Sequence, residues 1–472
     1  MKNVVALSSV AALPGTGEAQ PSERPNLIVI LADDLGYGDL GCYGQSQIPT
    51  PNLDRLAAEG TRFTDCYSGS TVCAPSRCVL LTGLHTGHCT VRGNGQEDLR
   101  PQDTTVAQIL QRAGYHCACI GKWGLGAVGK SGFPQKKGFD YFFGYLGHGH
   151  AHNYYPTHLW RNDKKYPLPN VVPDEKPSGA GTATELREYA ADRIAAEALT
   201  YLDSRRGQST PFFLYYCPTL PHANNEAQRE AKRGMECPDD RFYTQFASKD
   251  WPEPEKRKAA MISRLDHHVG ELMARLRQNG QDKNTVLLFT SDNGPHREGG
   301  NDPDFFRSSG PFQGIKRDLY EGGIRVPLIA WGPGRVRAGT TSAHIGYFAD
   351  FLPTLCDLAG LPVPSGGDGI SLLPTLSGPG GPGSQRTHPY LYWEFYERGG
   401  SRAVRMGKWK GICQPWNAPL EVYDLEADPG ERENLVAVQP QVASELRQAL
   451  SAAHVPSPNW KLPSETPAKQ KV

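Results

Sequence analysis

Oxygen-bearing side chains follow two apolar segments of this sequence at the points where those segments end. Asp33 and Asp34 come after one apolar run, and Asp292 and Asn293 come after another. Carboxylate and amide oxygens are the ligands that hard cations such as calcium or magnesium prefer. Each pair taken alone fits an acidic turn, a helix cap or an Asn-Gly turn equally well. Two such pairs at the ends of strands in one parallel sheet indicate a metal site.

A second segment whose residues could take part in a reaction is Cys73-Ala74-Pro75-Ser76-Arg77, which precedes a helix-compatible apolar stretch. Pro75 suits a first helical turn because the N–H that it lacks would have no partner there. The start of a helix presents free backbone N–H groups and a positive dipole end, which favour an anion. Cys73 and Arg77 lie one helical turn apart and can face the same anion. A buried cysteine at a helix N-terminus would give the same local pattern.

Strand and helix patterns alternate from residue 26 to about residue 360. Apolar runs predict strands at 27–31, 61–67, 115–120, 212–216 and 285–290, and apolar residues at helical spacing predict helices at 52–59, 105–113, 184–206 and 255–278. This alternation predicts an α/β fold with a large, mostly parallel but mixed central sheet and helices on both faces. Ligands bind such sheets at the carboxyl ends of the strands, which is where the polar pairs lie.

The ends of the chain differ in composition from this α/β domain, which we place at 24–363. Lys2, an apolar stretch and small residues up to Ala19 predict a signal peptide over 1–19, and hence a secreted or periplasmic protein. Residues 364–386 have the Gly- and Pro-rich composition of a linker. Short aromatic and β-branched runs within 387–456 predict a small antiparallel sheet, followed by a helix at 441–452. We expect residues 457–472 to be disordered.

Composition excludes several classes of protein. The chain has 472 residues, with 50 Lys and Arg against 50 Asp and Glu, and this zero net charge argues against a nucleic-acid-binding protein. No apolar run is long enough for a membrane span. The 11 cysteines lack the paired C-x-x-C spacing of a structural zinc site. In an oxidising compartment they leave room for one or two disulfides.

The cysteine segment and several others together resemble the type I, formylglycine-dependent sulfatases of the alkaline phosphatase superfamily. The signature C-x-P-S-R, followed by an apolar stretch and Thr-Gly, is the most specific of them. The other matching segments occur in the family's order, namely Asp33-Asp34-Leu35-Gly36, Gly121-Lys122-Trp123-Gly124-Leu125-Gly126, Pro211 to Tyr216 with His222, Ser291-Asp292-Asn293-Gly294, Lys316 with Glu321 to Pro327, and Tyr423-Asp424-Leu425 with Glu433-Asn434-Leu435. The resemblance covers residues 24 to 436.

This resemblance implies a hydrolase that releases inorganic sulfate from sulfate esters. A formylglycine-generating enzyme would convert Cys73 to an aldehyde, whose hydrate has two hydroxyls on one carbon. One hydroxyl attacks sulfur, and the other loses its proton and expels sulfate. One calcium ion would be held by Asp33, Asp34, residue 73, Asp292 and Asn293. Arg77 and Lys122 would neutralise the hydrate and the sulfate, and His222 and Lys316 would contact sulfate and protonate the leaving oxygen.

One position departs from the family pattern. The family often has a histidine where this chain has Gly124, and that histidine is the base assigned to sulfate release. The segment 147–153 contains His148, His150 and His152 in alternation. We expect one of them to replace the base, with His152 preferred, although alternating histidines can also be an adventitious metal-binding loop. His296, three residues after Asn293, is a further candidate contact.

The resemblance leaves three functions open. The first is a sulfatase acting on sulfated sugars or aryl sulfates. The second is a phosphonate monoester or phosphodiester hydrolase of the same superfamily, because tetrahedral anions present similar charges to Arg, Lys and calcium. The third is a secreted sugar-binding protein that has lost catalysis, for which Gly124 is the supporting residue. The position of the sulfate and exo or endo cleavage are not readable from the sequence.

Overall fold

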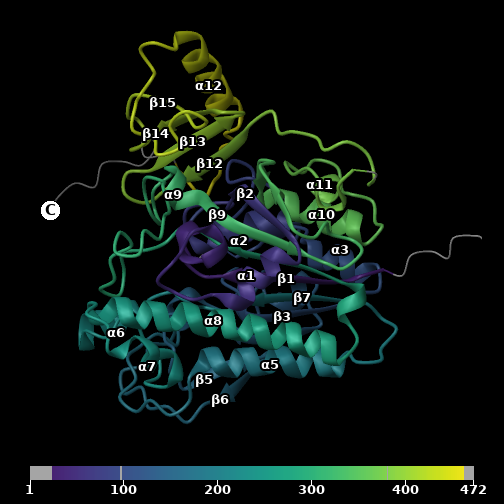
Figure 1. The fold of residues 1–472 in the computed structure, drawn as a ribbon, viewed down its shortest axis with the longest axis vertical. Helices are drawn as coiled ribbons and strands as arrows, with labels where there is room; N and C mark the ends of the chain where they lie inside the picture. The colour runs from purple at the N-terminus through teal and green to yellow at the C-terminus, as the bar shows by residue number, and fades with distance from the viewer. Residues whose placement is uncertain (1–23, 96–97, 380, 462–472) are drawn as a thin grey trace, which may run out of the picture.

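The fold is described here from a computed structural model, which covers residues 24–95, 98–379 and 381–461. One sheet of eleven strands forms the body of the molecule, and a second sheet of four strands lies beside it (Figure 1). The predicted α/β fold with a large mixed sheet and a small C-terminal antiparallel sheet is confirmed. The predicted signal peptide over 1–19 lies outside the described residues.

The large sheet is parallel at its centre and has antiparallel pairs on both sides of the centre, while the outermost pair at one edge is parallel again. Its strand order is β10-β2-β9-β8-β1-β7-β3-β4-β5-β6, and β11 pairs with β2. The strands are β1 (Asn26–Ala32), β2 (Thr61–Tyr67), β3 (His116–Lys122), β4 (Tyr141–Tyr145), β5 (His158–Arg161), β6 (Lys164–Pro167), β7 (Phe212–Cys217), β8 (Thr285–Ser291), β9 (Arg325–Trp331), β10 (Thr340–Ser342) and β11 (Gly346–Tyr347). Strand β1 pairs in parallel with both β7 and β8, so three carboxyl ends meet at one edge.

Both faces of the sheet are covered, as the continuous apolar sequence of β1 requires. Alternate residues of β1 enter two separate apolar cores, with Leu27 and Val29 in one and Ile28 and Ile30 in the other. The first core includes residues of α2 (Cys73–Thr82), α3 (Val106–Arg112) and α10 (Phe351–Leu358). The second includes residues of α1 (Pro51–Ala58), α5 (Ala190–Ser204) and α8 (Glu253–Gln278). Figure 1 shows α5 and α8 running side by side.

Short helices occupy the connections. They are α4 (His148–Ala151), α6 (Asn225–Ala231), α7 (Arg241–Ala247), α9 (Glu321–Ile324) and α11 (Leu373–Ser377), together with the 3₁₀ turns η1 (Tyr37–Asp39), η2 (Gly41–Tyr43), η3 (Pro134–Lys137), η4 (Asp282–Asn284) and η5 (Phe348–Asp350). Helix α4 comes directly after β4, and α6 follows β7. Both therefore lie beyond the strand ends where the polar residues gather.

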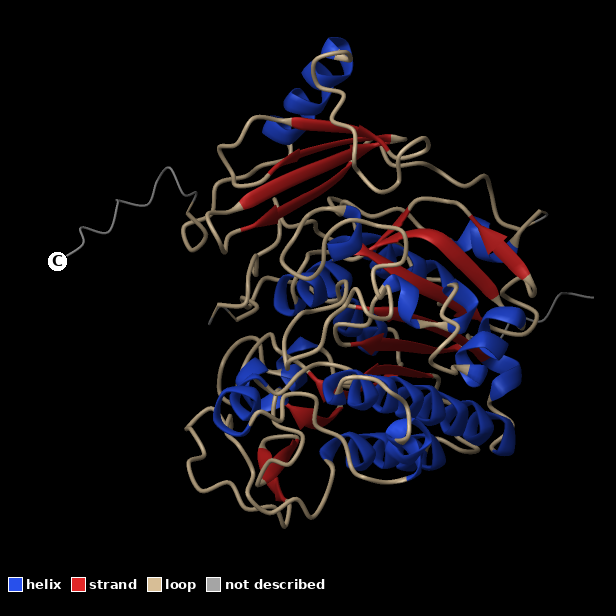
Figure 2. Ribbon diagram, turned by 60° about the vertical axis from the view of Figure 1, so that its left-hand side comes forward, coloured by secondary structure: helices blue, strands red, loops and turns tan. Residues whose placement is uncertain are grey.

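The C-terminal sheet is packed on the body and is not a separate unit. It comprises β12 (Leu391–Phe395), β13 (Ser401–Met406), β14 (Trp409–Cys413) and β15 (Glu421–Asp424), with α12 (Pro440–Ala452) on its outer face (Figure 2). Trp393 belongs to a core of the body, and its Nε1 donates to the Ser68 carbonyl at 2.9 Å. The neighbouring Tyr392 belongs instead to the core under α12.

Three charged side chains join the body to this sheet, and we call them the junction triad. They are Glu321 of α9, Lys410 of β14 and Glu431, all buried. Lys410 Nζ lies 2.8 Å from Glu321 Oε1 and 2.8 Å from Glu431 Oε1. The Glu321 N–H donates to Glu431 Oε2 at 2.6 Å. Arg325 and Arg405 add further charges on the side facing β2.

Three predicted boundaries change. The helix predicted at 184–206 begins only at Ala190, because Leu186, which is apolar, is exposed and does not pack. The predicted linker 364–386 contains helix α11, whose Leu376 is fully buried in the body. Of the predicted disordered tail 457–472, only residues 457–461 are described, and there Trp460 packs on Tyr396 and donates to the Thr90 carbonyl at 2.8 Å.

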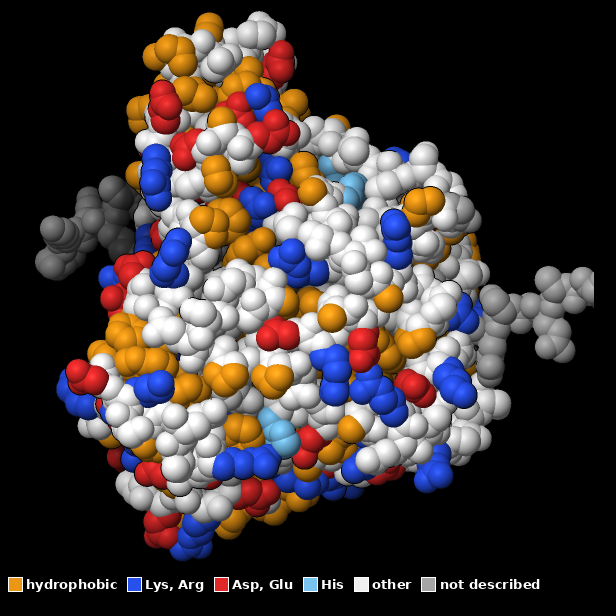
Figure 3. Space-filling model, viewed as in Figure 1, with side chains coloured by type: hydrophobic (Ala, Val, Ile, Leu, Met, Phe, Trp, Pro, Cys, Tyr) orange, Lys and Arg blue, Asp and Glu red, His pale blue; other side chains and the backbone are white. Residues whose placement is uncertain are grey.

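All eleven cysteines lie within the described residues, and each is a free thiol. The structure therefore contains none of the disulfides for which the cysteine count left room. Among the described residues, no helix has both the length and the apolar composition needed to cross a bilayer. On the face drawn in Figure 3, basic and acidic side chains are interspersed and do not form a large patch of one sign.

Candidate active site

Four oxygen-bearing residues meet beyond the ends of β1 and β8. The two strands are parallel neighbours with Ala32 opposite Ser291, so the residues that follow them are adjacent in space. The Asp34 N–H donates to Asp292 Oδ1 at 3.2 Å, and Asn293 Nδ2 donates to Asp34 Oδ1 at 2.7 Å. Asp33 lies beside them, and all four side chains are fully buried. The structure thus brings together the four residues that the sequence predicts as metal ligands.

Asp34 reaches this position through an uncommon backbone conformation. Its φ is +62°, in the left-handed region that residues other than glycine seldom adopt. Aspartate tolerates this region better than most residues. Such a conformation is held by surrounding contacts, and it often marks a functional site. Here it turns Asp33 and Asp34 towards one buried cluster of polar side chains, which we refer to below as the pocket.

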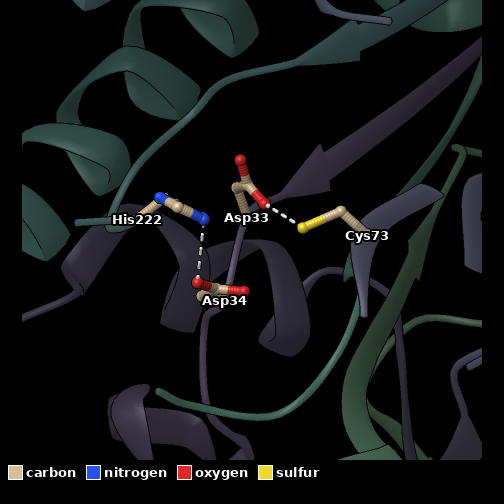
Figure 4. A group of neighbouring side chains, drawn as sticks. All are labelled: Asp33, Asp34, Cys73 and His222. Atoms are coloured by element: carbon tan, nitrogen blue, oxygen red, sulfur yellow. Dashed lines mark hydrogen bonds and ion pairs between the residues drawn. The ribbon is translucent and has the colours of Figure 1, made fainter. Parts of the chain in front are cut away.

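Cys73 is the first residue of α2 and points into this pocket (Figure 4). Its Sγ donates to Asp33 Oδ1 at 3.3 Å and accepts from Lys122 Nζ at 3.3 Å. Burial raises the pKa of the Cys73 thiol well above its ordinary value, and the charges of Asp292 and Asp33 raise it further. An unmodified thiol here is protonated and is therefore a weak nucleophile and a weak metal ligand.

The start of α2 is fixed by contacts with its neighbours. Ser76 Oγ accepts from the Gly69 N–H at 3.1 Å, and the Ala74 N–H donates to Asn94 Oδ1 at 2.9 Å. A Cβ at Gly69 would lie 2.4 Å from Cβ of Val79, so the loop before α2 packs against the helix only because residue 69 is glycine. These contacts set the position of Cys73. The local sequence carries no pattern that predicts the role of Asn94.

Three cations surround the carboxylates, each paired with one of them. Arg77 donates to Asp292 Oδ2 through Nε at 3.1 Å and through a terminal nitrogen at 2.7 Å. Lys122, the last residue of β3, donates to Asp33 Oδ2 at 2.7 Å. Lys316, from the loop between β8 and α9, donates to Asp34 Oδ2 at 2.8 Å. These buried positive charges can receive an anion.

The cations also control the protonation of the carboxylates. Burial would raise the pKa of Asp33, but the charges of Lys122 and Arg77 bring it well below its ordinary value. The pKa of Asp34 falls to about 2, because the charge of Lys316 outweighs burial. Burial and the charge of Asp33 raise the pKa of Asp292 to about 7. The negative charge of Asp292 is thus not fully balanced by the cations of the site. This fits a site that binds a further cation.

His222 follows β7 and completes the inner pocket. Its Nδ1 donates to the Ala223 carbonyl at 2.7 Å, so its Nε2 accepts from Lys316 Nζ at 3.1 Å. Burial and the charge of Lys316 lower the pKa of His222 well below its ordinary value, and the ring is neutral. Its Nε2 also lies 3.4 Å from Asp34 Oδ2, as Figure 4 shows.

The histidines of 147–153 separate into two groups because they form the short helix α4 and its C-cap. Residues four apart share a face of a helix, whereas the residue between them points away. His152 stacks on the His222 ring with 4.8 Å between centroids, and its Nδ1 contacts Glu226 Oε2 at 3.2 Å. His150 points away from the site: its Nε2 donates to the His158 carbonyl at 2.9 Å, and its ring packs edge-on against Tyr145. The structure therefore does not bring His150 to the site.

His148 occupies the space beside Gly124. Its Nε2 donates to the Gly124 carbonyl at 3.1 Å, and a Cβ built on Gly124 would lie 2.6 Å from its Cε1 atom. His148 Nδ1 is buried without a hydrogen-bond partner. Burial, then the charges of Lys122 and Arg77, lower the pKa of His148 well below its ordinary value.

Two residues at the rim, Glu298 and Arg317, were not among the predicted site residues. Glu298 lies 3.5 Å from Lys316 Nζ and is paired with Arg317, which also contacts Glu397 of the C-terminal part at 3.2 Å. His296, which the sequence does predict, lies between this rim and His222, with 5.9 Å between the two rings. Only the proximity of Glu298 to His296 along the chain hinted at its place.

A large mixed sheet with buried carboxylates, cations and a cysteine at its strand ends has the architecture of the alkaline-phosphatase-like hydrolases. The sulfatase family model matches residues 25–361, and a model described as N-sulphoglucosamine sulphohydrolase, C-terminal, matches residues 312–455. The chain belongs to the sulfatase family and is a sulfuric ester hydrolase.

Relatives of known activity support this assignment. Arylsulfatase A of Homo sapiens is 32% identical, over 93% of this chain and 88% of that protein. N-acetylgalactosamine-6-O-sulfatase of Bacteroides thetaiotaomicron is 29% identical, over 96% of this chain and 99% of that protein. Among solved structures, Ps i-CgsB in complex with k-i-k-neocarrahexaose is 27% identical with a TM-score of 0.76, covering 93% of this chain and 94% of that one.

Proposed function

We propose that this protein hydrolyses sulfate esters of carbohydrates to an alcohol and inorganic sulfate, using a formylglycine made from Cys73 and one calcium ion. The observation that carries the proposal is the position of Cys73. Its side chain lies among three buried cations and three buried carboxylates, yet its own thiol is held protonated. A neutral thiol interacts only weakly with these charged groups. The hydrate of an aldehyde would instead place hydroxyl groups where Lys122 and Asp33 already contact the sulfur.

The residues at the strand ends fit calcium. Their donors are the oxygens of Asp33, Asp34, Asp292 and Asn293, the type that this hard cation prefers. Asn293 Oδ1 is buried without a hydrogen-bond partner, which is costly unless a ligand completes it. When bound, calcium would polarise a sulfate oxygen and favour the ionised form of the nucleophile.

Formylglycine at residue 73 would supply, as its hydrate, one hydroxyl that attacks sulfur and a second that allows sulfate to leave. Arg77, which is held by its hydrogen bonds to Asp292, would orient the formylglycine hydrate. Lys122, within 3.3 Å of the Cys73 sulfur, would stabilise the ionised hydroxyl. A formylglycine-generating enzyme is therefore a required partner during maturation.

Lys316 and His222 would act on the other side of the sulfate. The two side chains are joined by a hydrogen bond of 3.1 Å, in which the lysine donates to the neutral ring. A sulfate that entered between them would accept from both. A proton held on this pair is placed to pass to the leaving alcohol oxygen, which is the step that ester cleavage requires.

The carbohydrate substrate is proposed from two sources. One relative is named for a sulfated amino sugar, N-acetylgalactosamine 6-O-sulfate, and the solved neighbour is a complex with k-i-k-neocarrahexaose. A signal peptide over 1–19 would place the protein in the periplasm or outside the cell, where sulfated polysaccharides occur. Asn225, Glu298 and Arg317 at the rim would contact the sugar, because they join the pocket to the surface.

The test is the mass of the peptide that contains residue 73, measured beside hydrolysis assays. Conversion of the thiol to the aldehyde lowers the mass by roughly 18 Da. We expect this loss, together with release of sulfate from sulfated sugars or an aryl sulfate and little hydrolysis of a phosphonate monoester or phosphodiester. An intact thiol in a host that supplies the modifying enzyme, or faster cleavage of the phosphorus esters, would overturn the proposal.

A further inference from the structure

We propose that His148 is the base that accepts a proton from residue 73 when sulfate is released. The inference rests on the proposed function, since it assigns a residue to the second half of that reaction. It follows from the position of the His148 ring, from its one unpartnered nitrogen and from the helical turn that holds it.

The strand ends bring His148 to the same end of the sheet as the reacting residue. Strands β3 and β4 are parallel neighbours, and Lys122 lies opposite Tyr145. Beyond the paired ends, the Gly124 N–H donates to the Leu146 carbonyl at 3.1 Å, so the two segments leave the sheet together. Helix α4 then begins with His148, beside Gly124. Two residues earlier in the other segment, Lys122 contacts the Cys73 sulfur at 3.3 Å.

Gly124 is what allows the ring to lie there. With a side chain at 124, its Cβ would be 2.6 Å from Cε1 and 2.9 Å from Nε2 of His148, too close for either to remain. The backbone at 124 also has φ +79°, a conformation that favours glycine. The His148 imidazole thus fills the volume that a side chain at 124 would take. His148 therefore supplies an imidazole beside position 124, where the chain itself has glycine.

The hydrogen bonds of His148 leave one nitrogen free for chemistry. Its Nε2 must carry the proton that it donates to the Gly124 carbonyl. In the neutral ring its Nδ1 is therefore an acceptor, and this atom is buried without a partner. Burial first, and then the charges of Lys122 and Arg77, lower the pKa of His148 well below its ordinary value, so the ring is neutral. A bound sulfate would offset the charges of these two cations and so favour the transfer of a proton to Nδ1.

The two neighbouring histidines do not meet these conditions. His152 has its Nδ1 engaged by Glu226 and its ring stacked on His222. His150 lies on the opposite side of the helical turn and is held by His158. His148 is therefore favoured over His152, which the sequence alone had favoured.

The proposed step balances as follows. After the ester is cleaved, residue 73 carries a sulfate on one oxygen and a hydroxyl on the other. His148 Nδ1 takes the hydroxyl proton, the electron pair forms the carbonyl double bond, and the carbon–oxygen bond to sulfate breaks. Sulfate leaves, and the aldehyde is restored without any oxidant or reductant. The proton then passes from His148 to solvent.

The experiment compares His148→Ala and His148→Gln with the matched control His150→Ala, which removes a buried histidine outside the site. Each purified protein is checked for folding by circular dichroism and for the aldehyde at residue 73. It is then mixed with substrate, quenched during turnover, and the peptide containing residue 73 is weighed. We expect turnover of both His148 variants to fall by about 10²-fold. We also expect their peptide to carry the trapped sulfate ester, roughly 80 Da above the aldehyde hydrate and roughly 98 Da above the aldehyde.

The outcomes separate this inference from the proposed function. Wild type and His150→Ala should turn over normally without the adduct. Turnover of the His148 variants equal to that of His150→Ala would overturn the assignment. So would slow turnover without the adduct, because His148 would then act before the ester forms or only in packing. An unmodified residue 73 or an absence of sulfatase activity in the wild type would instead overturn the proposed function.

Discussion

The active-site pocket and the junction triad both bury charges of opposite sign, but they arrange them differently. In the junction triad, Lys410 lies between two carboxylates at 2.8 Å each, and a backbone N–H adds to the network. In the pocket, the cations and carboxylates surround a neutral thiol, and Asn293 Oδ1 and His148 Nδ1 have no partner. Glu431 Oε1 in the triad also makes no hydrogen bond, but the charge of Lys410 lies 2.8 Å from it. Charges that pair with one another hold two parts of a protein together, whereas charges that surround an unsatisfied centre are arranged for a ligand.

This difference predicts opposite effects of substitution in the two places. Changes in the pocket should alter turnover much more than stability, and changes in the triad should do the reverse. Active sites that hold strained or unpaired charged groups often lower the stability of a protein. Some pocket variants should therefore be slightly more stable than the wild type.

The largest effect is expected for Cys73→Ala. The substitution removes the residue that we propose becomes the nucleophile, so turnover should fall by at least about 10³-fold. The free energy of unfolding should change little, because the thiol makes only two weak contacts. Sulfate release and denaturant unfolding measured on one preparation check both parts. Residual turnover close to wild type would show that another group attacks the ester.

The next effect in size is expected for Lys410→Met. This change leaves Glu321 and Glu431 buried together without their shared cation, which costs about 3–5 kcal/mol of stability. Turnover by the folded fraction should be unchanged. Lys408→Met is the matched control, because Lys408 pairs with Asp424 at the surface and should have no measurable effect. Equal stability of the two variants would remove the structural role that we assign to the triad.

A smaller effect distinguishes residues within the pocket. Exchange of His152 for Ala removes the ring that stacks on His222 but leaves Nδ1 of His148 in place. We expect turnover to fall by roughly 10-fold through loss of His222 positioning, with no sulfate ester trapped on residue 73. Steady-state kinetics and the peptide mass measure this directly. A trapped ester in this variant would move the base from His148 to His152.

The smallest effect concerns the pH dependence of stability. Burial raises the pKa of Glu431 to about 7, while Lys410 opposes the shift and Glu321 adds to it. A carboxyl group with a raised pKa binds more protons in the folded state, so stability falls as the pH rises from about 4.5 through about 7. Lys410, together with Arg325 and Arg405, lowers the pKa of Glu321 to about 2 against the effect of burial, so this group loses its contribution only in strong acid.

Glu431→Gln should therefore flatten the stability curve between pH 5 and pH 8, by on the order of 2 kcal/mol. Denaturant unfolding of wild type and variant at several pH values measures the difference. If the stability curves of wild type and variant run parallel over this range, Glu431 is ionised throughout and its pKa is not raised by burial.

Much of the fold could be predicted because buried strands carry a strong signal. The strands β1, β7 and β8 are continuous apolar runs, and polar residues follow each of them. That β1 and β8 are neighbours could not be predicted, because strand order depends on long-range packing. The meeting of Asp33 and Asp292 was therefore an inference from chemistry. Helix α5 shows the opposite error, since Leu186 continues the apolar pattern without being buried.

The histidine segment shows why part of the site was misjudged. Alternating His148, His150 and His152 would share one face if the segment were a strand, because a strand repeats every two residues. The segment is instead one turn of helix, which places His148 and His152 together and turns His150 away. The residues between the histidines include Gly147 and Gly149, which have no side chain. They therefore gave no hydrophobic pattern from which a helix could be told from a strand. The junction triad was equally hidden, because Lys410 lies in an ordinary strand pattern.

The packing of His148 against Gly124 also restricts the order in which mutations can accumulate in descendants of this sequence. Any side chain at 124 would meet the ring at 2.6 Å and would have to adopt φ +79°, so a first mutation at 124 would damage the site at once. A first mutation at 148 would remove the ring before anything replaced it. Neither single step moves the histidine to position 124, so that arrangement would require substitutions at both positions together.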